Sequence, residues 1–306
     1  MNTPKVAVLL CAYNGSAYIK EQVDSILGQT WSNLHLYIQD DCSTDNTREI
    51  LMEYSAHPEV TLISGDCHLG YPMCFYDLLS GVTDADYYAF SDQDDVWLPD
   101  KILRSVKLLR KCNPKKPALY YANYYICDKN LNTLHSVRGP SRKPDFPYSL
   151  YSSSLGLGFT YVLNEKARKL VTGYQPKKIL TKDWWIGMCC TAFGSACYDP
   201  VPCALHRRHE NAATPEAKTF AQIQRHRIKH FFFSDEGFRF VRDGLNEFYD
   251  VFRDRLPPGA HKTLSFFLNS PPRPLSGIQK AFYPKRLRYE FFDEILLRLI
   301  FLFGRL

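Results

Sequence analysis

Residues 5–28, KVAVLLCAYNGSAYIKEQVDSILG, place a strand pattern directly before a helix pattern. The apolar run VAVLLCA ends at Asn14 and Gly15, as expected for a buried strand that leads into a turn. Ser16 can cap a following helix, and Gly28 can end it. The apolar positions of that helix recur at helical spacing: Tyr18, Ile19, Val23, Ile26 and Leu27. The stretch therefore predicts a strand, a turn and an amphipathic helix.

The same order of strand and helix recurs three times before residue 113. Strands and helices are expected to alternate, strand first, over residues 34–41, 43–56, 60–66, 73–82, 86–92 and 98–112. Such alternation predicts an α/β protein with a Rossmann-like, doubly wound, mostly parallel sheet. Ligands of these sheets bind beyond the carboxyl ends of the strands, so we look for a site in the segments that follow each strand.

The rest of the chain differs in pattern and in charge. Residues 118–128 and 156–164 each predict a strand, whereas the chain from about Phe220 is helical and basic. Residues 1–218 contain 23 Lys+Arg and 23 Asp+Glu, and residues 219–306 contain 15 and 9, so the whole net charge of +6 lies in the last 88 residues. This asymmetry predicts an α/β domain over 1–218 and a basic, mainly helical region over 219–306.

The ten cysteines are irregularly spaced and form no C-x-x-C pair. The N-terminal apolar run ends in Tyr-Asn-Gly, where a secretory signal would have a small-residue cleavage site. No apolar stretch reaches the roughly 18 to 20 residues that are needed to span a bilayer. We therefore expect reduced, mostly buried thiols in a cytoplasmic protein.

Residues 87–100, YYAFSDQDDVWLPD, carry three carboxylates directly after an apolar run: Asp92, Asp94 and Asp95. Like charges this close repel one another unless a cation lies between them. An oxygen-rich cluster suits a hard divalent cation such as Mg²⁺ or Mn²⁺, which keeps positions open for substrate phosphate oxygens. The alternative is an acidic loop on a solvated surface. Because the cluster follows a buried strand at the ligand edge of the sheet, we favour the metal site.

A second acidic group, Asp40, Asp41 and Asp45, follows the second expected strand. Ser43 and Thr44 can cap the next helix, and acidic residues are favourable near a helix N-terminus. A carboxylate at the tip of this strand can also accept a hydrogen bond from the imide N–H of a uracil or thymine. The two interpretations are compatible with each other.

Two later motifs add further polar groups. In TKDWW, Asp183 precedes Trp184 and Trp185, and such apolar neighbours can raise the pKa of a carboxyl group so that it acts as a general base. The alternative is a surface turn that the two tryptophans anchor. In HRRHEN, residues 206–211, an imidazole can complete a metal shell and an arginine can bind a diphosphate. The alternative there is a basic, solvated loop.

Taken in order, the motifs AYNG, DDCSTDNT, HLGYPMCF, SDQDDVWLPDK, GLGF, DWW and HRRHEN resemble glycosyltransferase family 2. The likeness covers roughly residues 4–212 and is greatest to bacterial rhamnosyltransferases and other cell-surface polysaccharide transferases. It implies the GT-A fold for a catalytic domain over 1–218, with residues 219–306 as a C-terminal helical extension. It also implies metal-dependent, inverting transfer of a sugar from a UDP- or dTDP-sugar to a saccharide or lipid-linked acceptor.

The resemblance further implies roles for individual residues. The nucleotide-sugar site falls on Cys11, Tyr13, Asn14, Glu21, Asp41, Asp92 and Arg207. The ligands of a Mn²⁺ or Mg²⁺ ion fall on Asp92, Asp94 and His209, with Asp95 adjoining. Asp183 corresponds to the base that deprotonates the acceptor hydroxyl as it attacks the anomeric carbon. The metal and Arg207 would stabilise the departing diphosphate.

Two other functions are open on the sequence. DQDDV matches the nucleophile motif of haloacid-dehalogenase-type phosphatases, but that motif normally follows the first strand, and here three β-α units precede it. A non-catalytic, peripheral membrane or nucleic-acid-binding protein would rely on the basic C-terminal region. The acidic clusters argue against a nucleic-acid groove in the first two-thirds of the chain, so we expect no nucleic-acid partner.

The last residues, RLRYEFFDEILLRLIFLFGRL (286–306), form one wide apolar helical face among basic side chains. The face consists of Phe291, Ile295, Leu299 and Phe303, widened by Phe292, Leu296 and Ile300. Such a helix either packs on the protein or on a second copy, or lies in the interface of an anionic membrane. The second alternative would make the protein peripheral on the inner face of the cell membrane.

Overall fold

The computed structural model describes residues 3–65, 67–137, 139, 144–151, 155–178, 181–209, 235–268 and 275–306. It divides into two compact units. The first unit consists of Met1–Lys143, Gly156–Gln175 and Gly194–Pro215, and the second of Pro144–Leu155, Pro176–Phe193 and Glu216–Leu306. Two segments of the predicted catalytic domain, 144–155 and 176–193, thus belong to the second unit. The functional boundary at residue 218 stays a prediction.

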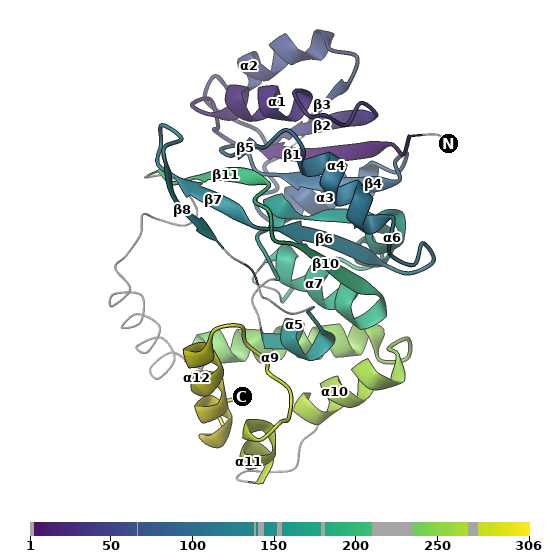
Figure 1. The fold of residues 1–306 in the computed structure, drawn as a ribbon, viewed down its shortest axis with the longest axis vertical. Helices are drawn as coiled ribbons and strands as arrows, with labels where there is room; N and C mark the ends of the chain where they lie inside the picture. The colour runs from purple at the N-terminus through teal and green to yellow at the C-terminus, as the bar shows by residue number, and fades with distance from the viewer. Residues whose placement is uncertain are drawn as a thin grey trace. The chain divides into compact units, whose positions relative to one another are not determined.

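The first unit is built on a seven-stranded sheet in the order β10-β6-β9-β4-β1-β2-β3 (Figure 1). Its strands are β1 (Val6–Ala12), β2 (Leu34–Asp40), β3 (Val60–Ser64), β4 (Tyr87–Ser91), β6 (Ala118–Ala122), β9 (Val162–Asn164) and β10 (Ser195–Asp199). All neighbouring pairs are parallel except those that β9 makes with β4 and β6. The predicted doubly wound, mostly parallel sheet is confirmed.

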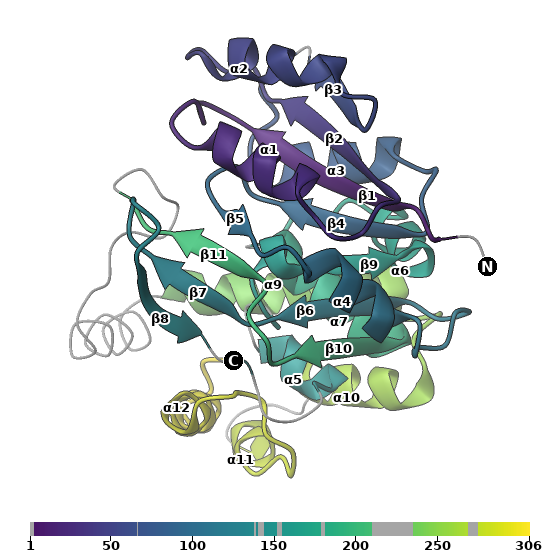
Figure 2. The ribbon, with the colours of Figure 1, turned by 45° about the horizontal axis from the view of Figure 1, so that its top comes forward.

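Helices cover both faces of this sheet. In the first unit they are α1 (Ile19–Leu27), α2 (Thr47–Glu53), α3 (Met73–Gly81), α4 (Lys101–Leu109) and α6 (Glu165–Thr172). The even-numbered side chains of β1 share a buried cluster with residues of α1 and α4, as expected for a strand whose side chains alternate between faces. Figure 2 shows α1 and α4 on the same side of the strands, while α3 packs with α6.

Two predicted details of this region are wrong. Helix α1 begins at Ile19, and Ser16 does not cap it; the Ser16 backbone N–H instead donates to Asp45 Oδ2 at 3.1 Å. Helix α2 begins at Thr47 after Asn46, so Ser43 and Thr44 do not cap it either. In both cases polar groups of these residues bond across to the neighbouring loop, because the carboxyl ends of β1 and β2 lie side by side there. Gly28 does end α1, as predicted.

The predicted strand over 118–128 divides at Asn123 into β6 and β7 (Tyr124–Cys127). The side-chain amide of Asn123 donates to the Pro200 carbonyl at 2.6 Å, and its oxygen accepts from the Gly139 backbone N–H at 2.6 Å. These bonds redirect the chain into a second sheet in the order β5-β11-β7-β8. Its other strands are β5 (Val96–Trp97), β8 (Thr133–Val137) and β11 (Ala204–Arg207).

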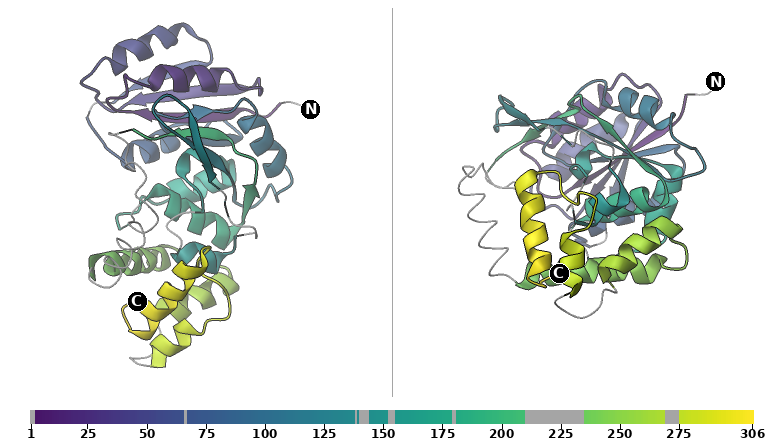
Figure 3. Two further views of the ribbon diagram at one scale, coloured as in Figure 1. Left: turned by 60° about the vertical axis from the view of Figure 1, so that its left-hand side comes forward. Right: turned by 60° about the horizontal axis from the view of Figure 1, so that its bottom comes forward.

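The described part of the second unit is helical. Its helices are α5 (Phe146–Tyr151), α7 (Lys182–Phe193), α9 (Asp235–Phe252), α10 (Pro258–Leu268), α11 (Leu275–Ala281) and α12 (Phe291–Leu302). Trp185, Phe248 and Phe252 are buried against one another, with ring centroids 4.9 to 5.8 Å apart. Figure 3 shows α11 and α12 side by side. Among the described residues, no helix combines the length and the apolar character that crossing a membrane requires.

Candidate functional site

The loops after β1 and β2 are joined to each other at the carboxyl edge of the sheet. The Asn14 backbone N–H donates to Ser43 Oγ at 3.0 Å, and the Thr44 backbone N–H donates to Asn14 Oδ1 at 2.8 Å. Asn14 has a positive φ of 49°, a conformation that asparagine tolerates better than most residues. The predicted residues Cys11, at the end of β1, and Asn14 therefore border the segment that carries Asp41.

Asp41 is buried and holds the loop that follows β3. Its two carboxylate oxygens accept the backbone N–H groups of Leu69 at 2.7 Å and Gly70 at 2.8 Å. His68 Nδ1 lies 2.9 Å from Asp41 Oδ2, and the His68 ring lies 4.2 Å from that of Tyr13. A carboxylate has about four lone-pair positions, so Asp41 retains the capacity to accept another N–H. Asp41 and the exposed ring of Tyr13 thus combine an acceptor with an aromatic surface.

Asp45 organises the same pair of loops. Although burial raises the pKa of this carboxyl group, hydrogen bonds from Ser16 and Thr47 lower it to about 2. The Thr47 hydroxyl donates to Asp45 and accepts a hydrogen bond from the Gly15 backbone N–H at 2.8 Å. Asp45 therefore stabilises the conformation of the loops that follow β1 and β2.

Gln93, within DQDD, was not predicted as a site residue. Its side-chain oxygen accepts the Tyr13 backbone N–H at 2.7 Å, and its amide donates to the Tyr13 carbonyl at 2.9 Å. A Cβ on Gly15 would lie 2.4 Å from Gln93 Oε1, so a larger residue at this position would have to displace the Gln93 side chain from its bonds to Tyr13. The only signal in the sequence was the place of Gln93 between two predicted ligands.

Arg207 connects three segments of the first unit. Its Nε donates to the Asp94 carbonyl at 3.0 Å, its Nη1 donates to the Lys129 carbonyl at 2.6 Å, and its Nη2 pairs with Glu21. The guanidinium carbon lies 4.4 Å from the centre of the Tyr18 ring. Arg207 is only 2% exposed, so in this structure it supports the loop of Asp94. Glu21, which was predicted beside the nucleotide base, is the carboxylate that pairs with it.

His209 and Asp94 lie side by side. His209 Nε2 is 2.9 Å from Asp94 Oδ2, and the His209 ring is 4.8 Å from the Tyr18 ring. The pairing of β5 with β11 explains this approach, because it sets Leu205 opposite Val96. Tyr18 packs against both Arg207 and His209, a role that its helical spacing did not reveal. The structure therefore brings together Asp94, Arg207, His209 and Glu21.

Asp95 points into the protein rather than toward this surface. It is fully buried, and its Oδ1 lies 2.7 Å from His206 Nδ1 and accepts the Arg207 backbone N–H at 3.3 Å. The His206 ring stacks on Phe159 with centroids 4.9 Å apart. Burial raises the pKa of Asp95. Burial also lowers the pKa of His206, but the bond to Asp95 leaves it raised. The Asp95–His206 pair therefore fixes the loop of Asp94 to the interior of the first unit.

Lys101 is a buried cation that the sequence did not single out. Its ammonium group donates to the Phe159 carbonyl and lies 3.1 Å from the centre of the Trp97 ring. Burial lowers its pKa to about 7, despite the opposing effect of Asp95 and Asp92. Lys101 places a titratable group beneath the acidic loop.

The metal prediction depends on Asp92, Asp94 and His209. Within the described residues, no group of three or more His, Cys, Asp or Glu side chains is arranged to hold a metal ion. Asp94 and His209 nevertheless present a carboxylate oxygen and an imidazole nitrogen 2.9 Å apart, and Asp92 is half-buried just after β4. Oxygen and imidazole donors suit Mn²⁺, and a catalytic ion leaves positions for substrate oxygens. The pair therefore fits part of such a ligand shell.

Asp183 lies in the first turn of α7, in the second unit. It is 6% exposed, and its Oδ1 is 3.6 Å from Lys182 Nζ. The next residue, Trp184, is buried, and its indole N–H donates to the Ser149 carbonyl at 2.9 Å. The alternative of a surface turn is therefore wrong, because DWW is part of a buried helix. The role of Asp183 as the base stays a prediction.

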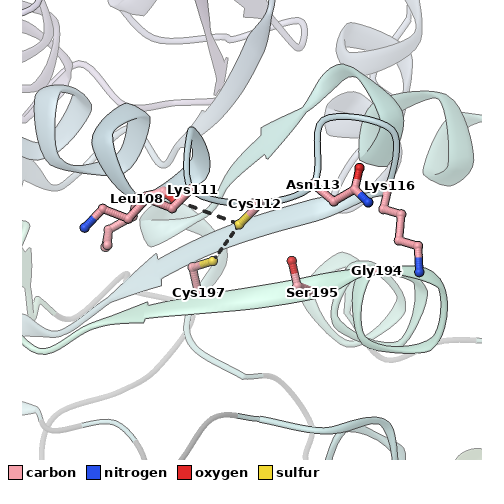
Figure 4. Close-up of a pocket in the computed structure, with 8 residues that line it drawn as sticks. All are labelled: Leu108, Lys111, Cys112, Asn113, Lys116, Gly194, Ser195 and Cys197. Carbon is pink, nitrogen blue, oxygen red and sulfur yellow. Dashed lines mark hydrogen bonds between the residues drawn. The ribbon is translucent and has the colours of Figure 1, made fainter.

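A cavity of about 450 Å³ lies elsewhere in the first unit (Figure 4). It is lined in part by Lys111, Asn113 and Ser195, and Cys112 Sγ and Cys197 Sγ lie 3.0 Å apart beside it. Ser195 opens β10 opposite the first residue of β6, so the cavity is at the amino ends of these strands. Ligands of doubly wound sheets bind at the other edge, and we do not assign the donor to this cavity. None of the ten cysteines is in a disulfide bond, and five of them are buried.

Comparison with known proteins agrees with this architecture. Residues 7–171 match the family model for glycosyl transferase family 2. The dTDP-rhamnosyl transferase RfbG of Shigella flexneri is 30% identical over 218 residues, which span 66% of this chain and 72% of that protein.

Two solved structures show a similar fold. The S. aureus protein TarS (residues 1–349), solved in complex with UDP-GlcNAc, has a TM-score of 0.56 at 15% identity, over 85% of this chain and 78% of that one. The mannosyltransferase PcManGT of Pyrobaculum calidifontis, in complex with GDP-Man and Mn²⁺, has a TM-score of 0.51 at 16% identity, over 100% and 87%. The fold, with its mostly parallel sheet, is that of GT-A glycosyltransferases, and the chain belongs to glycosyl transferase family 2.

Proposed function

We propose that this glycosyltransferase moves a sugar from a UDP- or dTDP-sugar to a saccharide or lipid-linked acceptor, with inversion at the anomeric carbon and with the help of Mn²⁺ or Mg²⁺. The observation that carries the proposal is the meeting of Asp94, Arg207 and His209 in one unit with the Asp41–Tyr13 loops. These groups come from the carboxyl ends of strands, where such sheets bind ligands. The name of RfbG, a dTDP-rhamnosyl transferase, supports a dTDP-sugar as the donor. A role in cell-surface polysaccharide synthesis rests on the family resemblance of the sequence motifs.

The nucleotide base would lie between the loops that follow β1 and β3. Asp41 is held in place by two backbone N–H groups and can accept the imide N–H of uracil or thymine. The exposed Tyr13 ring offers a surface on which a base can stack, with Cys11 and Asn14 at its border. Adenine has no ring N–H on the corresponding edge, so an acceptor such as Asp41 disfavours it. Guanine does offer an N–H to a carboxylate, so the preference for UDP or dTDP over GDP rests on the family resemblance and on the name of RfbG.

The diphosphate would lie at the Asp94–His209 pair, with Asp92 close by in sequence. When bound there, Mn²⁺ or Mg²⁺ would supply the positive charge that stabilises a leaving diphosphate. The residues of the chain fix this position: Arg207 holds the Asp94 carbonyl, and Glu21 holds Arg207. In this structure the charge of Arg207 is paired with Glu21, so direct contact of Arg207 with the diphosphate stays a prediction.

Asp183 would act as the base. In an inverting transfer, the acceptor oxygen attacks the anomeric carbon while its proton passes to a carboxylate, and the bond to the diphosphate breaks on the opposite side. The side chain of Asp183 is nearly buried, which strengthens its interaction with an acceptor hydroxyl. The phosphatase alternative is not supported, because DQDDV follows the fourth strand of a glycosyltransferase sheet.

A thermal-shift panel tests the donor class. The full-length protein is heated with Mn²⁺ and UDP-, dTDP-, GDP- or ADP-sugars, since a ligand that binds the folded state raises the melting temperature. We expect the pyrimidine nucleotides to stabilise the protein and the purine nucleotides to leave it unchanged, and Asp41→Ala to abolish the difference. Stabilisation by GDP- or ADP-sugars alone would rule out the proposed role of Asp41.

A further inference from the structure

Helix α12 is apolar on two faces, and only one of them is covered. Leu297, Ile300 and Phe301 are buried. The opposite row repeats every four residues and is 37 to 66% exposed: Phe291, Ile295, Leu299 and Phe303. This row is the centre of the face that the sequence predicted. Phe292 widens it as expected, but Ile300, which was expected to do the same, is buried on the other side of the helix. Helix α12 packs on its unit through the face of Leu297, Ile300 and Phe301, so the exposed row is not needed for that packing.

Helix α11 repeats this arrangement. A Cβ on Gly277 would lie 2.3 Å from the Phe301 carbonyl oxygen, so the two helices approach closely through the glycine. Leu275, Ile278 and Phe282 remain exposed on α11 and just beyond its end. Their spacing of three and four residues places them on one helical face. Each helix of the pair thus buries one face and leaves a second apolar face uncovered.

We call the exposed apolar residues of this pair the α11–α12 surface: Leu275, Ile278, Phe282, Phe291, Phe292, Ile295, Leu299, Leu302 and Phe303. Ten of the sixteen exposed large apolar side chains in the described part of the chain lie between residues 275 and 303. Single exposed apolar residues are normal, but contiguous ones mark a surface that binds something.

The segment between the helices adds positive charge. Lys285 and Arg286 are exposed there. Residues 275–306 contain six Lys or Arg and three Asp or Glu, which gives a net charge of +3. One of the acidic residues, Glu294, is buried and accepts the backbone N–H groups of Leu287 and Arg288. Lys280 is buried as well, and Arg298 pairs with Glu294. The charges that reach solvent are therefore those of Lys285, Arg286, Arg288 and Arg305 against Glu290 and Asp293, and Lys285 Nζ lies 3.4 Å from Asp145 Oδ2.

This surface is preformed. Arg298 pairs with Glu294 at 2.6 Å and donates to the carbonyls of Tyr283 and Lys285 at 3.0 and 3.1 Å, as well as to that of Ala281. These bonds fix the segment between α11 and α12 and satisfy its backbone. The exposed phenylalanines are thus presented by a fixed helix pair.

We propose that the α11–α12 surface docks the protein on an anionic lipid bilayer, with both helices lying in the plane of the interface. A helix of 12 residues is about 18 Å long, shorter than the roughly 30 Å hydrocarbon core, so α12 lies on the membrane and does not cross it. Apolar side chains bordered by Lys and Arg are the composition that such interfaces bind. A second copy of the chain would bring the same positive charge against itself, which disfavours a dimer.

Co-sedimentation with vesicles tests the proposal. Full-length protein is mixed with vesicles of equal parts phosphatidylglycerol and phosphatidylcholine, and separately with phosphatidylcholine alone. Binding is expected only to the anionic vesicles and should weaken as salt rises. The triple variant Phe291→Ser, Phe292→Ser, Phe303→Ser should bind at least about tenfold more weakly. Lys285→Gln with Arg286→Gln should weaken binding about fivefold for each charge removed.

The matched control removes three exposed apolar side chains of the first unit, Met52, Leu134 and Val201, which are 52 to 61% exposed. With serine at these positions, vesicle binding should be unchanged. Circular dichroism confirms that each variant is folded. Failure of the wild-type protein to bind anionic vesicles at low salt, or full binding by the triple phenylalanine variant, would overturn the proposal. A dimer in sedimentation velocity that dissociates in the same variant would identify a second copy as the occupant and overturn it as well.

Discussion

Asp183 combines burial with a place at the start of a helix, and both bear on its proposed role as the base. Asp183→Asn keeps the size of the side chain but cannot take a proton. We expect sugar transfer to fall by roughly 10²- to 10⁴-fold, with the affinity for the donor unchanged. Steady-state rates and calorimetric donor titration measure the two quantities. Asp84→Asn, at an exposed carboxylate, is the control. Normal turnover with lost donor binding would assign Asp183 to the donor pocket instead.

Lys101 predicts a pH dependence of stability. Its pKa is about 7 in the folded protein, against 10.5 for an ordinary lysine, because burial disfavours the charged form. Between these values the unfolded chain binds more protons than the folded one, so this residue makes the free energy of unfolding rise with pH. Below about pH 7 the lysine is protonated in both states, and its burial then lowers the free energy of unfolding by the full amount. Urea unfolding from pH 7 upward should show a smaller rise in Lys101→Met than in the wild type. Equal slopes would show that Lys101 is charged in the fold.

At the residue scale, the sequence predicted the loops that carry the site better than the contacts within it. The positions of Asp41, Asp94 and His209 after strands could be predicted from short motifs, whereas their roles in binding stay predictions. The contact of Arg207 with Glu21 could not, since it joins residues 186 apart and depends on how β11 pairs. Asp95 was grouped with the metal ligands, yet it is buried under the loop against His206.

At the element scale, local pattern predicted strands and helices but not where long strands divide. The run 118–128 is apolar or aromatic apart from Asn123 and Asp128, and a single asparagine within such a run does not by itself predict the change of sheet at Asn123. That change depends on Pro200 and Gly139, which are distant in sequence. The expected strand over 156–164 likewise keeps only Val162–Asn164 as a strand, antiparallel to its neighbours.

Two glycines provide a matched test of packing between elements. A Cβ on Gly194, just before β10, would lie 1.8 Å from the Pro117 carbonyl oxygen, whereas a Cβ on Gly81, at the end of α3, would meet nothing within 4 Å. Gly194→Ala should therefore lower the free energy of unfolding by about 2 kcal/mol or more. Gly81→Ala should change it by about 1 kcal/mol or less, in the stabilising direction. Equal effects in urea unfolding would contradict the close approach at Gly194.

At the scale of the whole molecule, alternation over the first 112 residues predicted the sheet of the first unit. The division into units was less accessible, because residues 144–155 and 176–193 join the helical unit through contacts with α9. Trp184 illustrates this, since Gly244 allows α9 to approach its ring. Charge was informative: the basic excess in the last 88 residues coincides with the region that carries the α11–α12 surface.

The most direct test of the proposed function is the release of nucleoside diphosphate from UDP- and dTDP-sugars as Mn²⁺ is returned to chelator-treated protein. We predict that release depends on Mn²⁺ in the wild type and is lost in Asp94→Asn. Without metal, the melting temperature of the variant should equal or exceed that of the wild type, because the substitution removes a carboxylate from an acidic cluster. Metal-independent release, unchanged activity in Asp94→Asn, or phosphate release from phosphomonoesters in place of nucleoside diphosphate would contradict the account.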